Sequence, residues 1–308
     1  SSYREYRICG MGPPSSGATT VLQILGSIER FDMGALYEKD PARAWHVIGE
    51  AMRLAYADRE KYLADQDFIS VPVAGLIDKK YLAKRSQLIA LQGTRPQLPG
   101  IETYPAGNPP GASPRTAAIS SEVAGTTHFT AVDREGNIAN MTSTVEGPFG
   151  SRVMAAGFLL NNELTDFTFA PKKDGAPVAN RVQAGKRPLS SMSPTIVYNA
   201  KGEPILALGS AGGKRIIMHV TKTLIGVLDY GLPLKDAMAL PNIFFGGSGL
   251  LIENGSDLVK LQPDIARLGH IVVTTNLPSK LAGAQKTDQG WIGAVDPRST
   301  GEAVSELP

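Results

Sequence analysis

Cysteine is nearly absent from this chain, since Cys9 is the only one among 308 residues. A single thiol excludes an intrachain disulfide framework and any metal site built on cysteines. Histidine is also scarce, and the spacing of His46, His128, His219 and His270 does not match that of zinc ligands. The sequence therefore predicts neither a metal ion nor a cofactor.

Long apolar runs and an excess of charge are missing as well. No run approaches the roughly 18 apolar residues of a membrane helix. The formal net charge is +2, with no basic stripe, so we expect no nucleic-acid or anionic-membrane partner. The first residues, 1–7, lack both an initiator methionine and the apolar core of a signal peptide. We therefore expect the chain to be a fragment of something longer.

What is present is an ordinary globular composition with two different halves. Hydrophobic residues make up 42% and charged residues 19%. Residues 3–12 are typical of a short strand, residues 18–30 of an apolar helix, and Asp40-Pro41 of the start of an amphipathic helix. Prolines and glycines between 93 and 125 exclude regular structure there. The pattern then predicts strands at 127–133, 138–145, 195–199, 204–209, 271–275 and 291–295, and helices at 214–230, 234–239 and 257–268. Hairpins that bracket helices indicate an α+β fold.

The junction between Gly125 and Thr126 resembles a self-cleavage point. Cleavage there would leave Thr126 with both a hydroxyl nucleophile and a free α-amine. An α-amine titrates at about 7.7–8.0, so it is suited to accept the hydroxyl proton. The alternative is that Thr126 simply begins a strand, because threonine favours strands.

A second threonine lies where a hairpin would place it beside the first. Thr144 follows Thr126 by eighteen residues, on the neighbouring strand of the predicted hairpin. Its hydroxyl is then within reach of the amine or hydroxyl of Thr126. Cross-strand threonine pairs are also common structural features, so the pair alone does not establish a role.

A glycine-rich turn precedes the helix predicted at 214–230. The amides of Gly212 and Gly213 at the start of that helix suit an oxyanion hole. A phosphate loop is excluded because Lys214 is followed by Arg215 rather than by Ser or Thr. The alternative is an ordinary tight turn.

Two further loops carry polar side chains, one suited to a negatively charged ligand group and the other to a positively charged one. Ser190 and Ser191 lie in a proline-bracketed loop that suits a carboxylate ligand or, equally, a simple turn. Glu163 and Asp166 would converge on an ammonium group if their segment curls; otherwise they are solvated acids.

Taken in this order, the motifs closely resemble those of γ-glutamyltranspeptidases, which are N-terminal-nucleophile hydrolases. The resemblance spans nearly the whole chain. The matching segments are 13–17, 31–33, 56–59, Thr126-Thr127-His128, 157–167, 186–194, Gly212-Gly213 and Asp296-Pro297-Arg298-Ser299. It implies a four-layer αββα sandwich that lacks part of the large subunit. Residues 1–125 would be the C-terminal part of that subunit, and residues 126–308 the small catalytic subunit.

The resemblance also implies roles for the individual residues. Thr126 would be the nucleophile both of autoprocessing at Gly125/Thr126 and of turnover, with Thr144 in support. Gly212 and Gly213 would form the oxyanion hole. The α-carboxylate of a γ-glutamyl group, as in glutathione, would be held by Ser190 and Ser191, and its α-ammonium by Glu163 and Asp166, with Glu146 nearby. The acyl group would pass to water or an amino acid, and relatives are typically exported to the periplasm or the cell surface.

This chain departs from the family pattern at three places. Glu146 stands where the family usually has Asn, and its carboxylate would strengthen ammonium binding or repel a substrate carboxylate. The earlier part of the large subunit is absent, together with the arginine that usually pairs with the α-carboxylate. The segment 169–185, which carries a lid in relatives, is short, and this favours water over larger acceptors.

Two alternatives to a γ-glutamyl enzyme therefore stay open. One is an acylase with the same machinery that removes a glutaryl side chain from a β-lactam nucleus. The other is an unprocessed, non-catalytic fragment that serves as a folded or binding domain.

Overall fold

The central element is an antiparallel six-stranded sheet that contains segments from both ends of the chain. The computed structural model describes residues 1–93, 104–118, 125–246 and 249–305. The sheet has the order β1-β2-β9-β10-β14-β15, and every adjacent pair is antiparallel. Its strands are β1 (Ser2–Tyr3), β2 (Tyr6–Gly10), β9 (Thr195–Tyr198), β10 (Pro204–Gly209), β14 (Ala282–Thr287) and β15 (Gly290–Val295). The two sides of Gly125 thus share one sheet.

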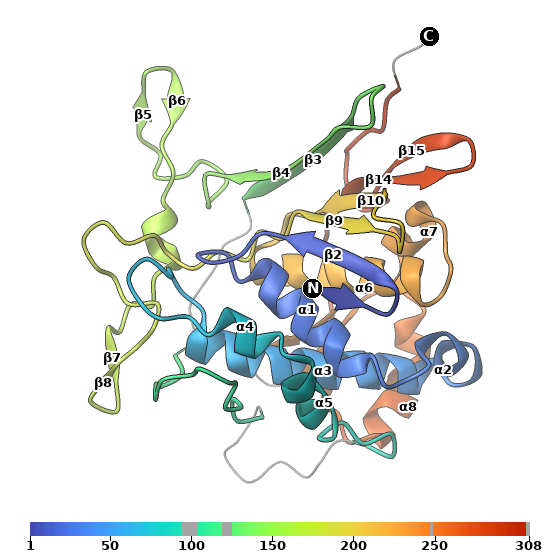
Figure 1. The fold of residues 1–308 in the computed structure, drawn as a ribbon, viewed down its shortest axis with the longest axis horizontal. Helices are drawn as coiled ribbons and strands as arrows, with labels where there is room; N and C mark the ends of the chain where they lie inside the picture. Colours follow the sequence, from blue (N-terminus) through green and yellow to red (C-terminus); the bar gives the residue numbers. More distant parts are fainter. Residues whose placement is uncertain (94–103, 119–124, 247–248, 306–308) are drawn as a thin grey trace.

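A hairpin of β3 (Thr126–Val132) and β4 (Ile138–Thr144) lies over this sheet (Figure 1). The Asn140 amide on β4 donates to the carbonyls of Thr195 at 3.0 Å and Leu208 at 3.2 Å. The ring of His128 lies so close to Gly209 that a Cβ there would come within 2.3 Å of it. These contacts hold the hairpin above β9 and β10.

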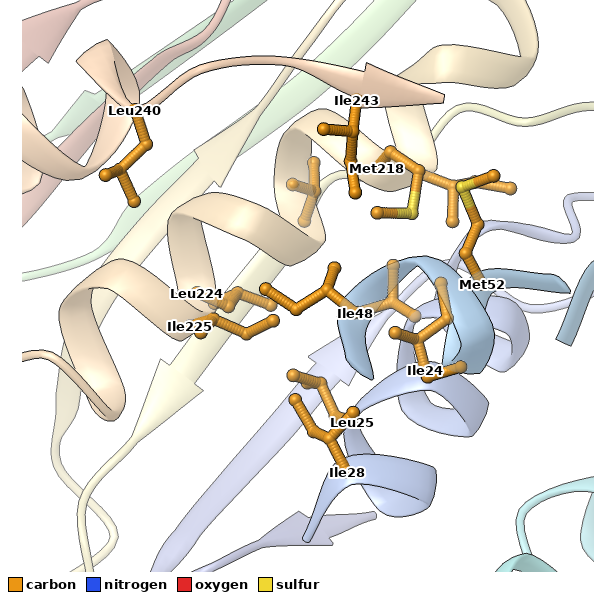
Figure 2. Close-up of a cluster of buried hydrophobic side chains, with 14 of the residues drawn as sticks. Ile24, Leu25, Ile28, Ile48, Met52, Met218, Leu224, Ile225, Leu240 and Ile243 are labelled. Carbon is orange, nitrogen blue, oxygen red and sulfur yellow. The ribbon is translucent and has the colours of Figure 1, made fainter. Parts of the chain in front are cut away.

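Helices cover the opposite face of the sheet. α1 (Gly17–Ile28) and α6 (Ile216–Leu228) pack side by side, and the long α3 (Pro41–Tyr62) lies beneath them (Figure 1). Figure 2 shows apolar side chains of the three helices converging, including Ile24, Ile48 and Leu224. Each is essentially inaccessible to water, and burying one such side chain contributes about 1.5–3 kcal/mol.

The remaining elements are smaller. α2 (Met33–Lys39), α4 (Val73–Leu76), α5 (Lys79–Ser86), α7 (Leu234–Ala239) and α8 (Leu258–Arg267) complete the helices, with the 3₁₀ turns η1 (Glu163–Asp166) and η2 (Gly213–Arg215). A second sheet joins β11 (Ile243–Gly246), β12 (Gly249–Glu253) and β13 (Val272–Thr275). The hairpins β5–β6 (Met154–Ala155, Phe158–Leu159) and β7–β8 (Lys172–Lys173, Ala176–Pro177) project from the body (Figure 1).

The α+β prediction is confirmed, with two β layers stacked on a helical layer. Within residues 1–93, 104–118, 125–246 and 249–305 these are three layers of an αββα sandwich, consistent with the expected loss of part of the large subunit. Of the predicted irregular segment, 94–103 and 119–124 fall outside the described residues, and 104–118 contains no helix. None of the described helices has both the length and the apolar character needed to span a membrane.

Candidate functional site

Thr126 and Thr144 form the centre of the candidate site. They are register partners at the open end of the β3–β4 hairpin, as the hairpin prediction requires. The Thr126 hydroxyl donates to Thr144 Oγ1 at 3.2 Å, and Thr144 Oγ1 also accepts from the Glu146 amide at 2.8 Å. Thr126 is only 9% exposed. The arrangement fixes one hydroxyl directly against the other.

The residue before Thr126 is held tightly against the chain that follows β4. A Cβ on Gly125 would lie 2.1 Å from the carbonyl oxygen of Glu146 and 2.7 Å from the carbonyl carbon of Gly147. Real side chains do not fit at such distances, so only glycine is accommodated. The Gly125 carbonyl accepts from Thr144 Oγ1 at 3.4 Å. The Gly125–Thr126 peptide bond is therefore closely packed on its Gly125 side.

Glu146 is buried next to this junction, with 2% of its surface exposed and a φ of +72°. Its Oε2 accepts from the side-chain Nδ2 of Asn162 at 2.7 Å. The side-chain Oδ1 of Asn162 in turn accepts from the backbone N–H of Gly147 at 2.8 Å. Asn162 therefore clamps both the side chain of Glu146 and the backbone after it. Asn162 lies in the matching segment 157–167, but the resemblance implied no role for it. The only sign of this role in the sequence is the residue type, because an asparagine side chain can donate one hydrogen bond and accept another.

Glu163 and Asp166 both lie in the 3₁₀ turn η1, directly after Asn162. The curl that would bring them together is thus present. Asp166 is buried, and its carbonyl accepts from the Asn180 amide at 2.7 Å, which fixes the end of the turn. Through Asn162, this turn is joined to Glu146. Two carboxylates three residues apart on such a turn lie on the same side of it and suit a cationic ligand group.

The serine loop is held by the segment that precedes α1. The backbone N–H and the Oγ of Ser16 both donate to the Ser190 carbonyl at 2.7 Å, and Ser15 Oγ donates to the Met192 carbonyl at 2.6 Å. Ser191 is buried beside them. The motif at 13–17 therefore anchors the loop in space, which its composition did not indicate.

A buried arginine from α3 also reaches this loop. Arg59 donates to Ser191 Oγ at 2.8 Å, to Ser16 Oγ at 2.9 Å and to the Glu60 carboxylate at 2.8 Å. Glu60 in turn accepts from Lys214 at 2.9 Å. Lys214 follows the glycine pair, so charged groups link the serine loop to the glycine turn. Arg59 belongs to the matching segment 56–59, for which the sequence predicted no contact with the serine loop.

An ion pair fixes the start of the serine loop. Arg187 donates from its backbone N–H and its guanidinium to Asp65, at distances of 2.7–3.0 Å. These hydrogen bonds, with the positive charge of Arg187, hold the pKa of the Asp65 carboxyl at about 2. Asp65 is therefore ionised near neutral pH when the loop is folded against it.

The glycine turn has the backbone that only glycine adopts readily. Gly212 has a φ of +143° and Gly213 a φ of +59°. A Cβ on Gly212 would come within 2.9 Å of the His219 ring on α6. That ring lies 3.0 Å from Ser210 Oγ, and burial lowers its pKa to about 3, so it is neutral near pH 7. A turn of this kind at a helix start can present its N–H groups to an anion.

The fold also brings together two histidines and a glutamate, although the histidines are far apart in the sequence. His46, Glu50 and His270 are buried together and could offer three metal ligands. However, His46 Nδ1 and His270 Nε2 are 2.7 Å apart, whereas two histidines on one zinc are separated by about 3.3 Å when Zn–N is about 2.0–2.1 Å. Glu50 already accepts from Arg53 and Tyr104. The geometry is that of a hydrogen-bonded pair.

A groove lies along the β3–β4 hairpin. It encloses about 1070 Å³ between the β3–β4 hairpin, the β14–β15 edge and residues 301–305. Its described lining includes His128 and Trp291 but none of the predicted site residues.

Comparison with known proteins gives consistent results. The profile of the gamma-glutamyltranspeptidase family matches residues 1–306. The chain is 38% identical over 247 residues to the glutathione hydrolase proenzyme of Bacillus subtilis (strain 168), covering 79% of this chain and 40% of that protein. It is 33% identical over 274 residues to the acylase ACY 1 proenzyme of Pseudomonas sp. (strain V22), covering 88% of this chain and 45% of that protein.

A solved structure shows the same fold. The cephalosporin acylase of Bacillus halodurans superposes with a TM-score of 0.79 at 22% identity, over the whole of this chain and 52% of that one. The chain spans 40–53% of the length of the first curated relatives it matches. On the family profile and the identities of these relatives, the chain belongs to the γ-glutamyltranspeptidase family.

Proposed function

We propose that this chain carries the catalytic centre of a γ-glutamyl hydrolase or transferase, with Thr126 as its nucleophile. The observation that carries the proposal is the Thr126–Thr144 hydroxyl pair beside the glycine-only position Gly125. An enzyme of this kind acts on glutathione and other γ-glutamyl amides. Similarity to glutathione hydrolase proenzymes supports it.

In the proposed reaction, Thr126 Oγ1 adds to the γ-carbonyl carbon while the α-amine takes the hydroxyl proton. The amides of Gly212 and Gly213 stabilise the oxyanion that forms. The amide C–N bond then breaks, and the proton passes to the leaving amine. Water or an amino-acid acceptor attacks the resulting ester, which releases free glutamate or a new γ-glutamyl amide and restores the Thr126 hydroxyl.

We infer that the free amine of Thr126 arises by autoproteolysis. Thr126 Oγ1 attacks the Gly125 carbonyl carbon, the peptide bond shifts to an ester, and water hydrolyses it. The contact between Thr144 Oγ1 and the Gly125 carbonyl supports this step, because a donor there offsets charge on the attacked oxygen. Residues 1–125 then form the C-terminal part of a large subunit, and residues 126–308 the small subunit.

The substrate is held at both polar ends of its glutamyl group. Ser190 and Ser191 bind the α-carboxylate, and Glu146, Glu163 and Asp166 bind the α-ammonium. The second assignment is supported by the spacing of Glu163 and Asp166 on one 3₁₀ turn and by the hydrogen bond from Asn162, the residue before that turn, to Glu146. Because the α-carboxylate and the α-ammonium of the substrate bind at different places, the direction in which its γ-amide points would be fixed.

The partner we propose is the N-terminal part of the large subunit. Among the described residues, β3 and β4 form a sheet of only two strands, and a two-stranded sheet is marginal by itself. Phe129 and Met141 on this hairpin are about half exposed, and Phe158 on β6 is 73% exposed. Further chain packed on these faces would cover them. By kinship, we propose that the protein acts in the periplasm or outside the cell.

A glutaryl acylase remains the second candidate, because Glu146 replaces the usual Asn and an acylase is among the relatives. Turnover of a γ-glutamyl anilide and of a glutaryl anilide by the full-length protein separates the two. Preference for the γ-glutamyl anilide supports our proposal, whereas preference for the glutaryl compound supports the acylase.

A denaturing mass measurement tests whether the centre is catalytic at all. We expect two polypeptides that meet at Gly125/Thr126, and a single uncut species with no turnover for Thr126→Ala. A wild-type protein that is never cut would instead support an inert folded fragment. Cleavage and turnover by Thr126→Ala would refute the nucleophile assignment.

A further inference from the structure

Arg59 is completely buried in α3, yet it bonds to two loops that are far from it in sequence. Its Nε donates to Ser16 Oγ and its Nη2 to Ser191 Oγ, across 43 and 132 residues. Its Nη1 donates to Glu60, a carboxylate that it shares with Lys214. Burying a guanidinium costs several kcal/mol unless it is paired and hydrogen-bonded. The two serine contacts are therefore part of what keeps this charge inside the protein.

The chemistry of the guanidinium sets the direction of both serine hydroxyls. Arginine has five N–H donors and no acceptor, so each serine oxygen must accept from Arg59. Each serine hydrogen then points away from the guanidinium. For Ser16 this hydrogen goes to the Ser190 carbonyl at 2.7 Å. A hydroxyl that accepts from a cation is also polarised into a stronger donor.

Arg59 thus acts on both members of the serine pair. It orients Ser16, which holds the backbone of Ser190, and it contacts the side chain of Ser191 directly. The proposed function assigns this pair to the α-carboxylate of the substrate, which needs hydroxyl hydrogens as donors. A positive charge behind Ser191 favours the same anion.

We propose that Arg59 is the positioning residue of the carboxylate-binding serine loop. It orients the hydroxyls of Ser16 and Ser191 so that the loop presents donors to the α-carboxylate of a γ-glutamyl substrate. This inference rests on the proposed function. A purely structural role, in which Arg59 only ties the loop to α3, predicts equal effects on substrates with and without that carboxylate.

The test compares two anilides in the full-length protein. The γ-glutamyl anilide carries the α-carboxylate, and the 4-aminobutanoyl anilide has hydrogen in its place but keeps the ammonium. For Arg59→Gln we expect KM for the γ-glutamyl anilide to rise about 10- to 100-fold, as for the loss of hydrogen bonds to a charged group, with kcat changed less than about threefold. The kcat/KM for the 4-aminobutanoyl anilide should stay within about twofold.

Arg53→Gln is the matched control. Arg53 lies on the same helix, is 4% exposed and pairs with Glu50 at 2.7 Å, so its loss also uncouples a buried charge. It should leave the ratio of the two substrates unchanged. Ser191→Ala should reproduce the selective loss, and Arg59→Gln should cost less in the Ser191→Ala background than in the wild type, because the contact with Ser191 is already lost and only the one with Ser16 remains.

The outcomes separate this inference from the proposed function. If the wild type fails to turn over the γ-glutamyl anilide, both are refuted. If the wild type is active but Arg59→Gln impairs both anilides equally, or Arg53→Gln shows the same selective loss, only the role of Arg59 is refuted. Should Arg59→Gln fail to fold, Ser16→Ala decides, with an expected selective rise in KM of about 3- to 10-fold. An unchanged KM ratio in Ser16→Ala would then overturn the proposal.

Discussion

Thr144 Oγ1 lies 3.2 Å from Thr126 Oγ1 and 3.4 Å from the carbonyl oxygen of Gly125, so one hydroxyl contacts both sides of the proposed scissile bond. We predict that Thr144→Ala slows self-cleavage and turnover about 10- to 100-fold, because a donor and acceptor is lost where charge develops. Thr144→Ser keeps the hydroxyl and should retain most of both rates. Time courses by mass spectrometry and anilide turnover measure them. Wild-type cleavage by Thr144→Ala would contradict the assignment.

Glu146 is the residue that should distinguish the two substrate classes. Glu146→Gln preserves shape and the ability to accept from Asn162, but removes a buried negative charge. We expect KM for the γ-glutamyl anilide to rise about tenfold, since the α-ammonium loses an ionic partner. Glu135→Gln, in the exposed turn between β3 and β4, is the control. An unchanged KM for the γ-glutamyl anilide in Glu146→Gln would contradict the assignment of Glu146 to the α-ammonium.

Gly212 and Gly202 form a matched pair of glycines with positive φ. At Gly212 a Cβ would meet the His219 ring at 2.9 Å, whereas at Gly202 it would meet open space. Gly202→Ala should cost about 1–2 kcal/mol of unfolding free energy and leave turnover intact. Gly212→Ala should reduce kcat about 100-fold or more, because the proposed oxyanion amides are displaced. Denaturant unfolding and kcat measurements test this, and normal kcat in Gly212→Ala would exclude the oxyanion role.

His219 predicts a loss of stability in mild acid. Burial lowers its pKa from the ordinary 6.5 to about 3. Above pH 6.5 the histidine is neutral in both states, and its contribution is fully present. Between pH 6.5 and 3 only the unfolded chain takes up the proton, so stability falls, by up to about 2 kcal/mol at pH 5.

The difference in unfolding free energy between pH 7 and pH 5, measured in denaturant, checks this prediction. His219→Gln should show a smaller difference than the wild type because it cannot take up that proton. Thr221→Val is the control, since Thr221 is buried on the same helix but does not titrate. An identical pH difference in wild type and His219→Gln would show that His219 does not contribute.

Short sequence patterns predicted the elements whose contacts are between residues close together in the chain. The β3–β4 hairpin follows from alternating residues around Gly136, whose φ of +85° closes the turn. The start of α3 follows from Asp40, which accepts from the Arg43 amide, and from Pro41 behind it. The predicted helix at 214–230 was less accurate, because it begins as a 3₁₀ turn at Gly213 and becomes α-helical only at Ile216. Elements such as β11 and β12 were missed because short apolar runs carry no distinctive period.

By itself the sequence determined the family, the α+β class, the hairpin that pairs Thr126 with Thr144, and the glycine turn, since all of these depend on residue identity and short-range spacing. Only the tertiary structure decided that Arg59 contacts Ser191, that Asn162 clamps Glu146, and that His46 pairs with His270 across 224 residues. Each of these contacts joins segments that meet only when the chain packs, two of them through residues of α3. Packing of this kind is set by many side chains jointly, so no local motif encodes it.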